Sequence, residues 1–188
     1  MAALCCGMAN AQMSPAPAAA QAGAPMEPSK ALDAMLNQLE HDVVPAAKAM
    51  PADKYNFAPS APGVFAEKSS AKFDTVRTFG EEVAHIAQAN YYFYSTVSGI
   101  KPDVDMRAMA KMTDKESAVK ALEGSFAFAH RAIATVTAAN AFETIKGADG
   151  MNTRATLSAF GVAHGYDHYG QMVEYLRMNG IIPPSSAK

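Results

Sequence analysis

Apolar residues recur at helical spacing in four segments of the chain. In the first segment, Ser29 occupies an N-cap position and Pro51 marks the end. The apolar positions between them fall three or four residues apart, as on one face of a helix: Ala31, Leu32, Met35, Leu36, Leu39, Val43 and Val44. This pattern predicts a first amphipathic helix from Ser29 up to Pro51.

The second segment predicts a helix from about Ala71 to Thr96. Gly99 and Pro102 follow it and are expected to terminate it. Its apolar positions again form one broad face: Phe73, Val76, Phe79, Val83, Ile86, Ala87 and Tyr94.

The third predicted helix begins at Thr113 and continues to about Asn140. Residues Thr113 to Glu116 have the form of a capping box. In that motif the threonine hydroxyl accepts a hydrogen bond from a free backbone amide, and the glutamate reaches back to the amide of the capping residue.

The fourth predicted helix is capped by Asn152 and Thr153 and runs to Gly180, which is followed by Pro183 and Pro184. No strand pattern is recognised between the four segments. We therefore expect an all-α fold, an up-down four-helix bundle over residues 29–184.

The residues before the first helix differ in composition. Residues 13–28 are mostly Ala, Pro, Gln and Gly, which bury too little apolar surface to offset the entropy of ordering, so a disordered linker is expected. Residues 1–12 hold a short apolar run that ends in Ala9-Asn10-Ala11, a pattern that signal peptidase accepts. We interpret them as the remnant of a secretory signal, which predicts an exported, periplasmic protein. The alternative is a disordered Ala-rich terminus on a cytoplasmic protein.

Composition limits the chemistry. A chain of 188 residues with 49% hydrophobic residues can bury one core. Nucleic-acid binding needs a cluster of basic residues, and the formal net charge of −2 gives no sign of one, so it is not expected. The apolar run at the N-terminus is too short to span a bilayer, so stable membrane insertion is not expected. Because Cys5 and Cys6 precede the predicted bundle, a metal there would need His, Asp or Glu ligands.

Three histidines carry the candidate chemistry. His164 and His168 lie four residues apart on the fourth predicted helix, so their Cβ atoms share a face about 5–6 Å apart. His85, on the second predicted helix, could supply a third imidazole. Three imidazoles can hold a divalent ion and leave positions open for water or substrate. The alternative is that these are ordinary helix histidines, as we expect for His41 and His130.

Two glycines accompany the histidine pair. Gly161 and Gly165 are also four residues apart, and each costs the helix roughly 1 kcal/mol relative to alanine. Close approach of a neighbouring helix to the histidine face, or tight packing alone, would offset that cost.

Two known helical metal motifs do not fit. The zincin peptidases need a glutamate directly after the first histidine, whereas Gly165 follows His164. The carboxylate di-iron bundles need two Glu-x-x-His units, and only Glu82 to His85 matches.

The chain resembles the DinB-like (DinB/YfiT) superfamily of metal-dependent four-helix proteins, over about Leu32 to Pro184. The resemblance is carried by three blocks: Val43-Val44-Pro45 with Met50 to Tyr55; Arg77 to Glu81 with Val83 to Ala87; and His164 to Gln171 with Tyr175 to Gly180 and Pro183-Pro184.

The resemblance implies a divalent-metal site, typically zinc or nickel, made by His85, His164 and His168. Some members act as thiol-dependent transferases or as hydrolases on small molecules, and many have no assigned activity.

An exported protein would meet little low-molecular-weight thiol, which weighs against the transferase. The alternatives are a non-catalytic, stress-associated protein that binds a metal or small ligand, and a structural bundle that forms a homodimer through a helix face.

Four neighbours could complete the site. Gln171 could hydrogen-bond a water on the metal or a substrate, or serve as a helix-contact amide. Asp167 could accept from an imidazole N–H and fix its tautomer, or be solvated. Tyr92 could line the same cavity, or be a buried tyrosine with a satisfied hydroxyl. Glu82 could be a fourth ligand, although the family pattern does not require one.

Overall fold

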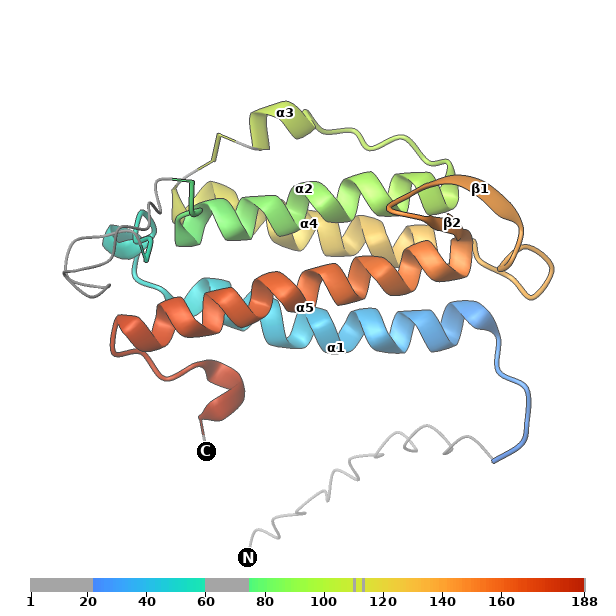
Figure 1. Ribbon diagram of the computed structural model, residues 1–188, viewed down its shortest axis with the longest axis horizontal. Coiled ribbons are helices and arrows are strands. Elements are labelled where there is room, and N and C mark those ends of the chain that lie inside the picture. The colour runs from blue at the N-terminus through green and yellow to red at the C-terminus, as the bar shows by residue number, and fades with distance from the viewer. Residues whose placement is uncertain (1–21, 60–74, 110, 113, 188) are drawn as a thin grey trace, which may run out of the picture.

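The computed structural model describes residues 22–59, 75–109, 111–112 and 114–187. Four long helices lie side by side and form a bundle, which confirms the predicted all-α fold (Figure 1). The helices are α1 (Pro28–Ala49), α2 (Phe79–Ser98), α4 (Lys115–Ile133) and α5 (Arg154–Met178). The short elements are η1 (Ala52–Lys54), α3 (Met106–Met109), β1 (Thr144–Ala148), β2 (Met151–Thr153) and η2 (Pro184–Ser186).

The helix directions do not alternate strictly, as an up-down order would require. The Lys115 ammonium at the start of α4 donates to the carbonyl of Lys48 near the end of α1, and His130 near the end of α4 contacts Asp33 near the start of α1. α4 is therefore antiparallel to α1 and parallel to α2, and the segment that carries α3 crosses back along α2 (Figure 1). α1 and α5 run one way, and α2 and α4 run the other.

The first two helices begin at other residues than the sequence predicted. Glu27 is the N-cap of α1 and Pro28 its first residue, a position that tolerates proline because no N–H is needed there. α2 starts at Phe79, where Thr78 forms a capping box with Glu81, so the predicted start near Ala71 was too early. Residues 71–74 lie outside the described residues.

The later helices also differ at their ends. Asp114, rather than Thr113, caps α4 by accepting from the Ser117 amide, and Thr113 lies outside the described residues. α4 ends at Ile133, short of the predicted Asn140. Thr153 caps α5 as predicted.

A two-stranded antiparallel hairpin lies between α4 and α5, which the sequence analysis missed. Its turn residues, Asp149 and Gly150, have φ values of 49° and 80°, as a type I′ hairpin turn requires. The turn needs positive φ at both positions, which Asp-Gly adopts at low cost. The hairpin packs against α2 and α5.

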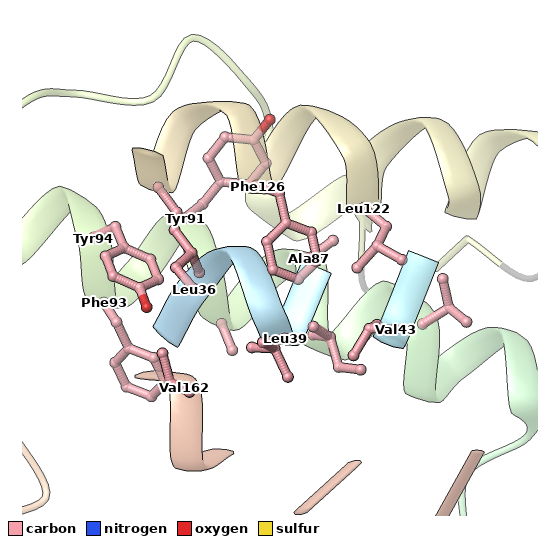
Figure 2. Close-up of a cluster of buried hydrophobic side chains, with 14 of the residues drawn as sticks. Leu36, Leu39, Val43, Ala87, Tyr91, Phe93, Tyr94, Leu122, Phe126 and Val162 are labelled. Carbon is pink, nitrogen blue, oxygen red and sulfur yellow. The ribbon is translucent and has the colours of Figure 1, made fainter. Parts of the chain in front are cut away.

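The core lies between the four helices and is built from large apolar side chains (Figure 2). Burying each such side chain stabilises the fold by about 1.5–3 kcal/mol. Fully buried examples from α1, α2, α4 and α5 in turn are Leu36, Leu39, Phe79, Ile86, Leu122, Phe126, Leu157 and Met172.

The two glycines of α5 permit close packing of neighbouring helices. A Cβ atom at Gly161 would lie 2.9 Å from the Tyr94 hydroxyl of α2. At Gly165 it would lie 2.5 Å from a methyl group of Leu39 on α1. Tight packing against two helices therefore offsets the helix-propensity cost of both glycines.

No helix within the described ranges is both long and apolar enough to cross a bilayer. The interpretation of residues 1–12 as a signal remnant lies outside those ranges, as does most of the predicted linker.

Candidate metal centre

The bundle brings the three predicted histidines together from two helices. His85 projects from α2, and His164 and His168 project from the antiparallel α5. Each offers a ring nitrogen within 4.8 Å of the other two. The ring centroids are 5.1 Å apart for His85 and His164, and 4.5 Å apart for each of the other two pairs. The three rings thus converge on one point and could hold a metal ion.

One pair of ring nitrogens has the spacing that a tetrahedral metal requires. The Nε2 atoms of His164 and His168 lie 3.3 Å apart. Two imidazole ligands of a tetrahedral zinc ion, each at about 2.0–2.1 Å from the metal, would be about 3.3–3.4 Å apart. The donor set of three imidazoles also suits zinc or nickel, which bind neutral ring nitrogens.

A buried carboxylate orients one of the rings. Oε2 of Glu82 lies 2.7 Å from Nδ1 of His168, and Glu82 is only 1% exposed. The Arg77 guanidinium lies 3.8 Å from the other carboxylate oxygen. Because an ionised carboxylate only accepts hydrogen bonds, His168 carries its proton on Nδ1 and leaves the Nε2 lone pair facing the other imidazoles. Glu82 therefore holds a ligand in place and is not itself among the converging donor atoms.

The site favours neutral imidazoles. Burial, the Arg77 guanidinium and the other two imidazoles together lower the pKa of His85 to about 4. Burial and the neighbouring His168 lower the pKa of His164, while the Asp167 carboxylate acts in the opposite direction. A metal ligand must be unprotonated, so the lowered pKa values of His85 and His164 favour binding of an ion.

A cavity of about 350 Å³ opens beside the triad. His85 and His164 form part of its wall, and Asp149 lines it from the turn of the hairpin. Its size is in the range of small-molecule sites. The other lining residues come from α2 and from the α3 segment: Gln88, Ala89, Tyr92, Phe93, Met106 and Arg107.

A family model described as the DinB superfamily matches residues 35–172. The chain belongs to the DinB superfamily. The matched region includes all three histidines and Glu82, and it covers the helices that position them. A search of curated proteins found no match.

The other predicted neighbours of this DinB-superfamily site lie at different places around it. The Gln171 amide nitrogen is 3.4 Å from Nδ1 of His168, on the edge of the ring that also faces Glu82. Asp167 is exposed on α5. Tyr92 is 51% exposed and lines the cavity, so its ring is available to a ligand.

The remaining two histidines of the chain lie away from the triad. The His41 side chain is 78% exposed on α1. His130 on α4 bridges two carboxylates of α1, with Nδ1 on Asp33 and Nε2 on Glu40. Because its two nitrogens face opposite partners, His130 ties two helices together rather than contributing to a common ligand site.

Sequence reasoning missed the two charged residues of the cavity, Arg107 and Asp149, and considered Glu82 beside the triad in another role. Asp149 could have been found from the Asp-Gly pair, which is a strong hairpin signal. Arg107 has no local signal, because the crossover that carries α3 is set by the tertiary fold. Glu82 was considered only as a ligand, since spacing along α2 relates it to His85 and says nothing about His168 on α5.

Proposed function

We propose that this DinB-superfamily protein binds one divalent ion at His85, His164 and His168 and acts on a small molecule held in the adjoining cavity, as a hydrolase or as a thiol or group transferase. The observation that carries the proposal is a cluster of three imidazoles, two of which, those of His85 and His164, line a ligand-sized cavity. A bound divalent ion would supply Lewis acidity, which lowers the pKa of a coordinated water or thiol. Three protein ligands are also the usual number in catalytic zinc sites.

The protein's own side chains provide the rest of the site. Glu82 fixes the orientation and tautomer of His168. The ring of Phe93 packs edge-on against His164, with centroids 5.3 Å apart, and Phe160 lies beside it at 6.3 Å. These rings limit the approach of water to His164 from that side and hold the imidazole in place.

Zinc or nickel is the proposed ion. Both bind neutral imidazole, and the site offers three such rings without a thiolate. The carboxylate of Glu82 is occupied by His168 and Arg77, which disfavours the harder, oxygen-preferring ions.

A non-catalytic binding protein is the second candidate. The observation that favours it is the paucity of acid–base groups: among the described residues that line the cavity, Asp149 alone carries a carboxylate. In this alternative the triad binds metal and the cavity binds a ligand, and no turnover occurs.

An activity test separates the two candidates. The full chain, loaded with zinc or nickel, is assayed for hydrolysis of a nitrophenyl ester and for transfer of cysteine to a chloronitrobenzene. We expect a metal-dependent rate in at least one assay that falls to background in His168→Ala and persists in the exposed control His41→Ala. Full metal occupancy without any metal-dependent rate would favour the binding protein.

We further propose that the protein is exported to the periplasm, on the support of the Ala9-Asn10-Ala11 pattern. Export would favour the hydrolase over the thiol transferase, because low-molecular-weight thiols are scarce outside the cytoplasm. N-terminal sequencing of the mature protein should then begin near Gln12, and an intact Met1 would refute export.

A further inference from the structure

One wall of the cavity is formed by the short α3 segment, which is held by a hydrogen bond to α2 and by a buried methionine. The Gln88 side chain of α2 donates to the carbonyl of Met106 at 2.9 Å. The Asp105 carboxylate accepts from the backbone amides of Arg107 and Ala108. Met109 is 4% exposed and packs into the core. Arg107 therefore lies in the cavity wall on a backbone that is held against α2.

The cavity combines an apolar body with one cationic side chain. Tyr92, Phe93 and Met106 supply broad apolar surfaces. Among the lining residues, Arg107 carries a permanent positive charge and Asp149 a negative one. The guanidinium fork matches a carboxylate or phosphate in geometry and charge.

The two charges lie on different walls of the cavity. Arg107 belongs to α3 and Asp149 to the turn of the hairpin, whereas His85 and His164 project from α2 and α5. An anionic group would thus be attracted to the α3 side of the cavity and repelled from the hairpin side.

We propose that the cavity takes a small monoanionic molecule with an apolar, preferably aromatic, body, whose acidic group pairs with Arg107 while its other end faces His85 and His164. The inference rests on the proposed function, because the triad defines which end of the ligand would react. Arg107 is then a specificity-determining residue that selects carboxylates over neutral and cationic analogues.

Three matched probes test this selection: cinnamate, neutral cinnamamide and cationic cinnamylamine. Their binding to the full chain is measured by calorimetry and ligand-observed NMR, in both metal-free and zinc-loaded protein. We expect cinnamate to bind about 5–10-fold more tightly than cinnamamide in both forms, because a partly exposed ion pair contributes only modestly to the binding free energy. Added salt should screen the ion pair and reduce the difference in affinity.

Variants assign the preference to one side chain. Arg107→Ala should bind cinnamate and cinnamamide equally, and Arg107→Glu should favour cinnamylamine. Lys111→Ala, which removes an exposed positive charge from the residues after α3, should keep the wild-type preference. Circular dichroism and thermal unfolding would establish that each variant is folded.

The outcomes separate this inference from the proposed function. A preference for cinnamate that survives Arg107→Ala and occurs only in zinc-loaded protein would place the carboxylate on the metal, which overturns the inference and leaves the metal site intact. Failure of all three probes to bind would also overturn it. Loss of the preference in metal-free Arg107→Ala supports the inference even if the triad proves unable to bind an ion.

Discussion

The carboxylate of Glu82 on α2 lies 2.7 Å from Nδ1 of His168 on α5. This contact joins the two helices that carry the three imidazoles, and it is buried at both ends, with Glu82 1% and His168 6% exposed. A buried carboxylate is costly unless it is paired, and here it is paired with both His168 and Arg77. The candidate metal site is therefore preorganised by groups that are not among its three donor residues.

Glu82→Gln should weaken zinc binding about 10-fold, because a neutral amide orients the His168 ring but no longer increases its basicity. Glu174→Gln provides the matched control, since Glu174 is exposed on α5, the helix that also carries His168. Competition titration against a zinc chelator dye measures both affinities. Equal affinities for the two variants would show that Glu82 does not support the ligand.

Removal of the metal should lower thermal stability. A ligand at 100 times its dissociation constant stabilises the native state by about 2.7 kcal/mol, which corresponds to a Tm increase of roughly 5–10 °C for a chain of this size. We expect the zinc-loaded protein to lose that increase when a chelator is added. His85→Ala should show the same Tm with and without chelator. An unchanged wild-type Tm would favour the purely structural bundle.

Gly165→Ala should destabilise the metal-free protein by about 1–3 kcal/mol, because the new Cβ would overlap the Leu39 methyl group in the core. Gly170→Ala is the control on the same helix: no atom lies within 4 Å of a Cβ there, and the gain in helix propensity should stabilise the protein by up to about 1 kcal/mol. Urea unfolding measures both changes. Equal stability of Gly165→Ala and Gly170→Ala would show that the contact with Leu39 does not require glycine.

The bridge between α4 and α1 should make stability depend on pH. Partial burial lowers the pKa of His130, but hydrogen bonds to Asp33 and Glu40 outweigh that effect and raise the pKa above its usual value. The protonated form is therefore favoured in the folded state. Its contribution is fully present below the unfolded pKa of about 6.5 and is lost as the pH rises through the higher folded value.

His130→Gln should accordingly cost more stability near pH 5.5 than near pH 9, with a difference of at most about 1 kcal/mol because the partners are partly exposed. Urea unfolding at the two pH values measures it, with the exposed His41→Gln as the control. A cost that is independent of pH, or larger at high pH, would contradict the bridge.

Local pattern predicted the bundle well and its connections poorly. The apolar spacing of residues such as Leu36 and Leu39 identified the helices because each must bury one face. The predicted start of α2 was too early because Phe73 and Val76 extend the apolar spacing upstream of Thr78. The capping box at Thr78 sets the actual start of the helix. The parallel arrangement of α2 and α4 depends on the crossover, which has no periodic signal.

The site was predictable to the extent that it depends on helix geometry. The pair His164 and His168 follows from spacing along one helix. His85 was a candidate because it lies within another predicted helix, and the family resemblance supported it. The partnership of Glu82 with His168 joins residues 86 positions apart, so only the packing of α2 on α5 reveals it. The same holds for Arg107, which reaches the cavity through a tertiary contact of its segment with Gln88.

Metal analysis of the purified full chain tests whether the three imidazoles hold an ion. Our expectation is one zinc or nickel ion per chain in the wild type and in His41→Ala, and loss of the ion in each of His85→Ala, His164→Ala and His168→Ala. Full metal content in the three single variants, with folding verified by circular dichroism, would contradict it.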